Sequence, residues 1–347
     1  MPAKGEVLSA QQAQDLALSE ASKGAGWVSP NPLVGCVVVD QQHRFLASGF
    51  HGYYGGPHAE RDAFAKLDLG LLQGATVYVT LEPCSHQGKT PPCTDLFLKQ
   101  KISKVVVGQT DPNPLVAGRG LAILKRENIA IATDEAFSKK SSRLAEIFLW
   151  HMQNKKPYVT LKVALSADGK IAGPPGSNPE ITSEASRFRA RELRATYDAT
   201  FIGAETFLCD NPLLDFRETQ WEGKKQPKVV ILDPRGRAQA FFAQSRLAQK
   251  VKSENVFFVA SVDEAMLRDL YLKGIYSLYV EGGAKTHELF IEQKLYQKLI
   301  CFVSPNKREL GVSWLWTPEQ IAAHAQHIET FSISEDEVRE YVPFEGE

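Results

Sequence analysis

Short β-branched runs alternate with helical segments along the chain, and this alternation limits the possible fold more than any other feature of the sequence. A helix is predicted over 9–23, and the first half then reads strand, helix, strand, helix, strand: 33–40, 58–67, 75–81, 93–99 and 104–108. Strands that alternate with helices form a parallel or mixed sheet, with helices covering both of its faces. We therefore expect an α/β fold.

The segment Asn154-Lys155-Lys156-Pro157 ends a helix predicted over 138–154 and precedes a new strand predicted over 158–167. A second series follows, with a helix over 183–197 and strands over 200–202, 229–232, 256–260, 277–280 and 298–303. A length of 347 residues exceeds the usual size of one compact domain. We expect two α/β domains, residues 1–154 and 155–347, with an acidic, loosely patterned tail from Pro318 onward.

Composition narrows the class of partner. The formal net charge is -1, whereas nucleic-acid binders usually carry a strong basic surplus. The five cysteines do not suggest a disulfide framework, and the N-terminus lacks a signal-peptide pattern. No apolar run approaches the roughly 20 residues that span a bilayer. We expect a soluble, cytoplasmic protein that acts on a small molecule as a homo-oligomer, without nucleic-acid or membrane partners.

One histidine and two cysteines occur in the order of a zinc deaminase site. The motif His-Ala-Glu at 58–60 is followed by Pro-Cys pairs that end at Cys84 and Cys93. The usual signature has only two residues between its cysteines, whereas eight stand between them here. One imidazole (His58) and two thiolates leave the fourth tetrahedral position of zinc for water, and zinc lowers the pKa of that water to about 7. Glu60 is then placed to move protons between water and substrate.

Each of these residues alone has an ordinary explanation. Cys84 and Cys93 can be buried thiols, and His58 can be a surface histidine. All the elements together, in this order and between predicted strands, favour the metal site. A helix that begins at Cys93 would also favour thiolate over thiol. His86, between the cysteines, is interpreted as a substrate-pocket residue or a plain loop residue.

Three segments of the first half resemble the bifunctional deaminase–reductase family of riboflavin biosynthesis. They are PCSHQGKTPPC at 83–93, NPLVGC at 31–36, and DPNP at 111–114 with AGRG at 117–120, within a resemblance that covers residues 9–150. The resemblance implies a cytidine-deaminase-like fold and a diaminopyrimidinone substrate with a ribosylamino 5'-phosphate, which loses its 2-amino group. It also implies that Asn31 faces the pyrimidine and that His86, Lys89 and the loop 111–119 border the phosphoribosyl group. Otherwise, Asp-Pro-Asn-Pro is simply a rigid turn.

The second half resembles the NADPH-dependent reductase domain of the same family, which has a dihydrofolate-reductase-like fold. The matching segments are 158–170, 203–206 with 210–217, and 280–284, within coverage of residues 157–305. The resemblance implies a catalytic Asp210 near the nicotinamide and ribose. It further implies substrate contacts from Lys162, Arg194, Leu214, Arg217 and Glu281, and cofactor contacts from Ala164, Thr206, Asp210, Gly283, Ala284, Lys285, Thr286, His287, Glu288 and Leu289.

The residues themselves support part of this interpretation. Glu281-Gly282-Gly283 follows a strand and precedes a helix, so backbone amides can meet a phosphate there, although a simple tight turn fits equally well. Arg187, Arg189, Arg191 and Arg194 share one predicted helix. With Arg217, some of them can form a fork for a phosphate, while a solvated charged face is the alternative for Arg187 and Arg189.

Three departures from the family pattern fall in the second half. Glu180 stands where the family commonly has a tryptophan that contacts the cofactor, and an acid there would repel its phosphates. Asn211 replaces the second acid of Asp-Asp-Pro, and 306–309 replace most of a glycine-rich ending. These departures leave open a deaminase whose second domain is not catalytic.

We expect a bifunctional enzyme that uses zinc for hydrolytic deamination and then NADPH for reduction of the ribosyl group to ribityl. A different class, a nucleic-acid deaminase or RNA-binding protein, would need a basic channel with aromatic side chains. The nearly balanced charge argues against that alternative.

Overall fold

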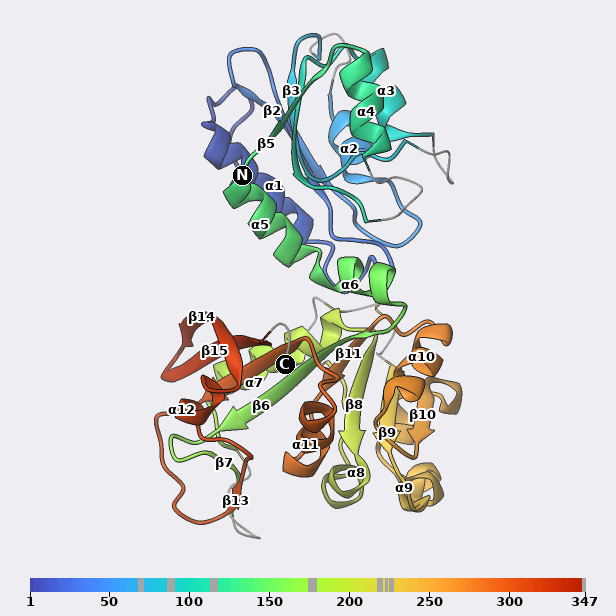
Figure 1. Cartoon of the computed structure of the whole chain (residues 1–347), viewed down its shortest axis with the longest axis vertical. Coiled ribbons are helices and arrows are strands. Elements are labelled where there is room, and N and C mark those ends of the chain that lie inside the picture. Colours follow the sequence, from blue (N-terminus) through green and yellow to red (C-terminus); the bar gives the residue numbers. More distant parts are fainter. Residues whose placement is uncertain are drawn as a thin grey trace. The chain divides into compact units, whose positions relative to one another are not determined.

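The computed structural model describes residues 1–67, 72–85, 91–112, 118–173, 180–216, 221, 224 and 228–344. The chain forms two compact units, residues 1–155 and 156–347, each built around its own sheet (Figure 1). The division falls one residue after the expected boundary. Lys155 ends the last helix of the first unit with a left-handed backbone, at φ 54°.

A five-stranded mixed sheet with the order β2-β1-β3-β4-β5 forms the first unit. Its strands are β1 (Gly35–Val39), β2 (Phe45–Phe50), β3 (Thr76–Leu81), β4 (Lys104–Gln109) and β5 (Ala130–Thr133). Strand β1 runs antiparallel to β2 and β3, while β3, β4 and β5 are parallel. The mixed sheet was predicted, but strands β2 and β5 were not.

Helices cover both faces of this sheet, as predicted (Figure 1). One face packs against α1 (Ala10–Ser22) and α5 (Glu135–Leu144), and the other against α2 (Ala59–Phe64), α3 (Cys93–Lys99) and α4 (Arg119–Arg126). The helix predicted over 138–154 is in fact two helices, α5 and α6 (Glu146–Asn154). Helix α5 starts early because the Asp134 carboxylate accepts a hydrogen bond from the backbone N–H of Phe137 at 2.9 Å.

The second unit contains an eight-stranded sheet with the order β10-β9-β8-β11-β6-β12-β15-β14. The strands are β6 (Tyr158–Leu165), β8 (Ala199–Gly203), β9 (Lys228–Leu232), β10 (Val256–Val259), β11 (Ser277–Val280), β12 (Lys298–Val303), β14 (Ala325–Ile333) and β15 (Asp336–Pro343). The six strands from β10 to β12 in this order are parallel, and β15 and β14 continue the sheet antiparallel. The short strands β7 (Lys170–Ala172) and β13 (Val312–Ser313) pair separately.

The C-terminal segment does not match its expected loose pattern, because β14 and β15 form a hairpin on the sheet. Strand β15 buries Val338 and Tyr341, whereas most of β14 is exposed at the sheet edge. Charged and polar side chains are typical of an edge strand, since they discourage pairing with other chains. Because these side chains are polar, the sequence of β14 has no apolar run that would predict a strand.

Helices also cover the second sheet. Helix α7 (Glu184–Thr196) packs on one face, and α10 (Glu264–Leu272) and α11 (Ala284–Glu292) pack on the other. Helices α8 (Ala204–Asp210) and α9 (Arg237–Phe241) lie beside β8 and β9, and α12 (Pro318–Ile321) precedes the hairpin. Short 3-10 turns occupy 242–244, 247–249 and 253–255.

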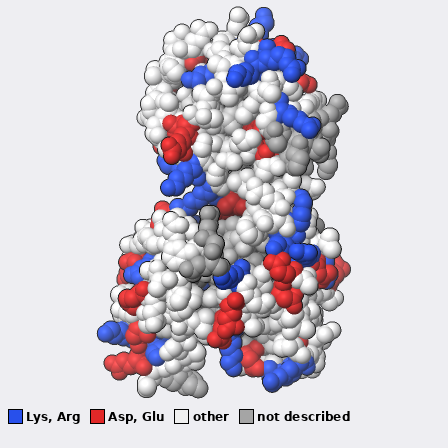
Figure 2. All heavy atoms as spheres, viewed as in Figure 1, with Lys and Arg blue, Asp and Glu red and all other residues white. Residues whose placement is uncertain are grey.

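Surface charge is mixed. On the face drawn in Figure 2, Lys and Arg side chains are interspersed with Asp and Glu, in keeping with the formal net charge of -1. Within the described ranges, no helix has both the length and the apolar character needed to cross a membrane.

Candidate metal centre and second cavity

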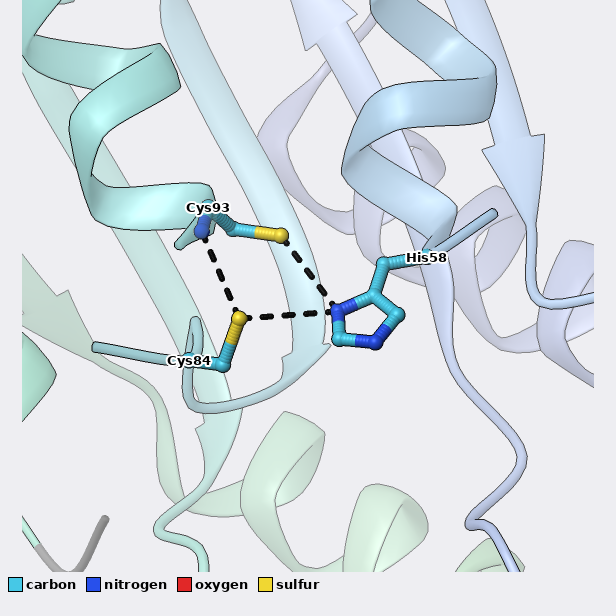
Figure 3. Close-up of side chains that lie close together, drawn as sticks. All are labelled: His58, Cys84 and Cys93. Carbon is cyan, nitrogen blue, oxygen red and sulfur yellow. Dashed lines mark hydrogen bonds between the residues drawn. The ribbon is translucent and has the colours of Figure 1, made fainter. Parts of the chain in front are cut away.

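The predicted metal ligands come together at three element ends of the first unit. His58 is the N-cap of α2, Cys84 follows β3, and Cys93 is the first residue of α3. The Nδ1 atom of His58 lies 3.5 Å from the Sγ atoms of both Cys84 and Cys93 (Figure 3). All three ligand atoms lie within 4.8 Å of one another.

These distances fit a zinc ion. Zinc binds histidine nitrogen at 2.0–2.1 Å and thiolate sulfur at about 2.3 Å, so a tetrahedral site separates the two atoms by about 3.6 Å. The observed separations of 3.5 Å agree with that value. One nitrogen and two sulfurs are also a ligand set that zinc favours, and three protein ligands leave a fourth position open.

The two thiols cannot both ionise easily without a cation. A hydrogen bond from Cys93 lowers the pKa of Cys84 to about 4, and His58 assists. The pKa of Cys93 is raised, first by its hydrogen bond to Cys84 and then by burial. A divalent cation between the sulfurs removes this conflict, which is a further reason to place a metal there.

Glu60 lies in the first turn of α2, two residues after His58, and its side chain is buried. Burial raises the pKa of its carboxyl group, and the neighbouring Cys84 adds to this effect. A carboxyl group with a raised pKa beside a metal site is suited to accept and return protons near neutral pH.

Asn31 lies beside a histidine that sequence reasoning missed. Its amide Nδ2 donates to Nε2 of His51 at 3.0 Å, and Nδ1 of His51 donates to the Pro57 carbonyl at 2.8 Å. The rings of His51 and His58 lie edge to face, with centroids 5.9 Å apart. Burial lowers the pKa of His51, which keeps the ring neutral. His51 precedes His58 by seven residues, but nothing in the sequence distinguishes it from a loop histidine.

Several expected residues lie outside the described ranges, namely His86, Lys89, Arg217 and most of the loop 111–119. The ends of that loop are described at Asp111, Pro112, Gly118 and Arg119.

A cavity of about 390 Å³ lies in the second unit beside α7. Lys162, Arg194, Leu214 and Glu281 line it together, although they come from distant parts of the chain. These are four of the five substrate contacts expected in this half, and the fifth is Arg217. Arg246, which the sequence did not single out, also lines the cavity.

Arg194 and Glu281 form a nearly buried ion pair in this cavity. Nε of Arg194 donates to the Glu281 carboxylate at 2.7 Å, and Nη1 donates to the Asp215 carbonyl at 2.8 Å. Burial favours the neutral form of Glu281, but Arg194 and Lys162 outweigh it and lower the pKa. Burial lowers the pKa of Lys162, against the attraction of Glu281. The cavity lining holds more cations than acids, because five Lys and Arg residues face Glu180, Asp215 and Glu281, and this excess suits an anionic ligand.

The other arginines of α7 divide into two groups. Arg187 and Arg191 line the cavity, whereas Arg189 is exposed and pairs with Glu192 at 3.4 Å. Arg187 pairs with Glu180 at 3.2 Å. This ion pair compensates the charge of Glu180, so the acid repels a phosphate less than the sequence alone suggests.

Two glycine turns at the ends of the neighbouring parallel strands β8 and β11 suit a dinucleotide. Gly203 and Gly283 are the N-caps of α8 and α11, and neither helix has a side-chain cap. A Cβ at Gly282 would lie 2.5 Å from the Thr286 Cβ, whereas a Cβ at Gly283 would meet nothing within 4 Å. The backbone at Gly283 is thus open to a ligand, and helix N-termini attract phosphates. These residues fit NADPH.

The side chains of residues 283–289 differ in their exposure to solvent. Lys285 is exposed, and Ala284 and Glu288 are half-buried, as are Ala164 on β6 and Thr206 on α8. His287 is fully buried, and its Nδ1 accepts a hydrogen bond from Trp314 at 2.9 Å. Leu289 packs against the core. A cofactor contact from His287 is therefore limited to its backbone, whereas Leu289 is only partly buried.

Asp210 is the last residue of α8, and its side chain is exposed. It does not line the cavity, but Pro212, two residues later, does. The catalytic role of Asp210 therefore stays a prediction.

The remaining departures from the family pattern have structural partners. The side-chain oxygen of Asn211 accepts a hydrogen bond from the backbone N–H of Arg246 at 2.8 Å, as a carboxylate would. The backbone N–H groups of Arg308 and Glu309 donate to Asp168 at 3.0 and 2.9 Å. The hydrogen bond from Ser166 and these two lower the pKa of Asp168 to about 2. The altered segment is thus anchored to the turn after β6.

Comparison with known families divides the chain in the same way. Residues 9–109 match the cytidine and deoxycytidylate deaminase zinc-binding region, and residues 157–307 match the RibD C-terminal domain. The riboflavin biosynthesis protein RibD of Actinobacillus pleuropneumoniae is 36% identical over 318 residues, which is 83% of this chain and 82% of that protein. RibD of Bacillus amyloliquefaciens is 37% identical over 311 residues, with the same coverage of 83% and 82%.

Solved structures agree over nearly the whole length. The diaminohydroxyphosphoribosylaminopyrimidine deaminase/5-amino-6-(5-phosphoribosylamino)uracil reductase of Thermotoga maritima has a TM-score of 0.80 and 34% identity, covering 96% of this chain and 98% of its own. Acinetobacter baumannii RibD has a TM-score of 0.82 and 31% identity, with coverage of 96% and 99%.

Proposed function

The chain belongs to the RibD family and is a bifunctional deaminase and reductase of riboflavin biosynthesis, and we propose that each of its two units carries one of the two reactions. The first unit is the zinc-dependent deaminase, and the second is the NADPH-dependent reductase. The observation that carries the deaminase assignment is the His58, Cys84 and Cys93 group beside the buried Glu60.

We propose that the substrate of the first unit is the one named for the Thermotoga maritima protein, a diaminohydroxypyrimidine with a phosphoribosylamino group. Its 2-amino group is replaced by oxygen, and ammonia leaves. His58, Cys84 and Cys93 hold zinc, which supplies a Lewis acid that makes water reactive near neutral pH. Glu60 takes a proton from the attacking water and returns protons to the ring nitrogen and the leaving amine. Asn31, held by His51, orients the pyrimidine.

In the second unit, the product of the first reaction occupies the cavity beside α7. The Arg194 guanidinium and the Lys162 ammonium attract its phosphoribosyl group, and Leu214 packs against it. The turn at Gly283 and the start of α11 would hold the phosphates of NADPH, which would supply the hydride. Lys162, half-buried in the same cavity as Glu281, would give a proton to the opened ribose when NADPH supplies the hydride.

We propose a cellular location and a class of partner from the cysteines and the net charge. The five free cysteines, two of them in the zinc ligand set, fit a reducing compartment, which supports a location in the cytoplasm. The small, nearly balanced net charge supports a small-molecule substrate and no nucleic-acid or membrane partner. We further propose a homo-oligomer, which light scattering on the purified protein will test.

Two assays on the purified protein test both reactions. Ammonia release from the diamino substrate should require zinc, and it should be lost in Glu60→Gln but kept in Glu135→Gln, a matched change at an exposed acid of the same unit. NADPH oxidation should follow when the deaminated compound is supplied. Ammonia release without NADPH oxidation would favour a deaminase with a non-catalytic second unit. Full activity of Glu60→Gln would overturn the assigned proton transfer.

A further inference from the structure

Glu82 is a buried carboxylate between β3 and the metal ligand Cys84, and the residue is only 4% exposed. Its oxygens accept hydrogen bonds from two separate stretches of backbone. Oε2 accepts from the N–H groups of Asp111 at 3.3 Å and Gly118 at 2.9 Å. Oε1 accepts from Gly120 at 3.1 Å and Leu121 at 3.4 Å. A single side chain thus holds Asp111, two residues after β4, and the start of α4.

The start of α4 also packs directly on the backbone next to Cys84. A Cβ atom at Gly120 would lie 2.3 Å from the Pro83 carbonyl oxygen and 3.2 Å from Oε1 of Glu82. Only glycine allows this approach, because a contact of 2.3 Å with a backbone atom cannot relax cheaply. Gly118 has a left-handed backbone, at φ 78°. The chain therefore reaches the rim of the metal site along a narrowly defined path.

We infer that Glu82 is a positioning residue for deamination, which fixes Asp111 and the start of α4 against the rim formed by Pro83 and Cys84. This inference rests on the proposed deaminase function. Arg119, between the anchored Gly118 and Gly120, is an exposed cation at that rim. The proposed substrate carries a phosphate, so displacement of this backbone weakens substrate binding more than it slows the reaction at the metal.

The chemistry of the four donors explains why the residue is an acid. A carboxylate offers two acceptor oxygens, one for each pair of N–H groups. A glutamine in the same place offers only one oxygen, and its NH2 group would face two N–H donors. Glu82→Gln therefore loses two of the four hydrogen bonds, either those from Asp111 and Gly118 or those from Gly120 and Leu121, with almost no change in side-chain volume.

The test measures kcat and KM for ammonia release by Glu82→Gln, together with zinc content and NADPH oxidation in the full chain. Hydrogen bonds to a charged group that lose their acceptor cost enough to weaken binding by about tenfold to a hundredfold, so KM should rise by about that factor. We expect kcat to stay within about threefold, with zinc and the reductase reaction unchanged. The reductase rate is an internal control for folding.

A second variant displaces the same backbone without changing Glu82. Gly120→Ala leaves the carboxylate intact but pushes the start of α4 from Pro83, so KM should rise in the same way. Asp134→Ala removes a capping carboxylate from α5 in the same unit and should leave KM unchanged. An unchanged KM in both Glu82→Gln and Gly120→Ala would overturn the inference, as would a fall in kcat with no change in KM.

A parallel loss of zinc and of both activities in the two variants would also overturn it, because Glu82 would then only stabilise the fold. If the unmodified enzyme released no ammonia, the proposed function itself would fail. If the unmodified enzyme released ammonia normally and the two variants had the same KM, only the inference about Glu82 would fail.

Discussion

Acidification should destabilise the reductase unit through His287. This side chain is fully buried on α11, where Nδ1 accepts a hydrogen bond from the indole N–H of Trp314 at 2.9 Å and Nε2–H donates to the Val280 carbonyl at 3.4 Å. The contact with Trp314 requires the neutral ring, because a protonated Nδ1 cannot accept a hydrogen bond. Burial lowers the pKa of His287 from 6.5 to about 4, and the nearby positive charge of Lys162 acts in the same direction.

The sign and size of the effect follow from these values. Below pH 6.5 the unfolded chain binds a proton at His287, whereas the folded unit binds one only near pH 4. The stability present above pH 6.5 is therefore lost as the pH falls towards 4. The full difference of about 2.5 pKa units corresponds to about 3.4 kcal/mol, of which about 2 kcal/mol is already lost at pH 5.

Urea unfolding of the full chain at pH 7.5 and pH 5.0 measures this loss, with NADPH oxidation as a probe of the folded second unit. His287→Gln keeps an acceptor for Trp314 but has no proton to gain, so its stability should fall by about 2 kcal/mol less than that of the unmodified chain over this interval. Comparison of the two chains cancels the contributions of all other titrating groups. Equal losses in both would refute the reasoning.

Three further predictions concern the two sites. Cys93→Ser should lower bound zinc, measured by elemental analysis, and reduce ammonia release at least a hundredfold while NADPH oxidation continues, because serine is a poor zinc ligand; normal zinc content would argue against this ligand set. Arg194→Lys should raise KM for the phosphoribosyl substrate of the reductase by about tenfold or more, since lysine lacks the fork that joins Glu281 to Asp215; an unchanged KM would exclude this role. Asp210→Ala should raise KM for NADPH and leave ammonia release intact, and equal losses in both assays would contradict separable sites.

The sequence predicts best where one physical property dominates a segment. The strands β11 and β12 and the helix α3 occur over the predicted residues, because continuous buried runs and a proline followed by helix formers leave few alternatives. Strand β2 contains Ser48 and Gly49, and β14 is mostly exposed, so neither has a continuous apolar run. The helix division at Ala145 was also missed, because the sequence there contains no Gly or Pro.

The metal ligands could be predicted because His58, Cys84 and Cys93 belong to few residue types and follow a recognisable order. Glu82 and His287 show what such patterns omit. Each is a side chain whose partners, at Gly118 and Trp314, lie 36 and 27 residues away in the chain. Their roles depend on which backbone or indole N–H faces them after folding, and no local spacing encodes that. For the same reason, the charge of Glu180 could be judged only after its ion pair with Arg187 was known. A site residue that reacts can often be recognised by its type, whereas one that positions a neighbour becomes visible only through its contacts.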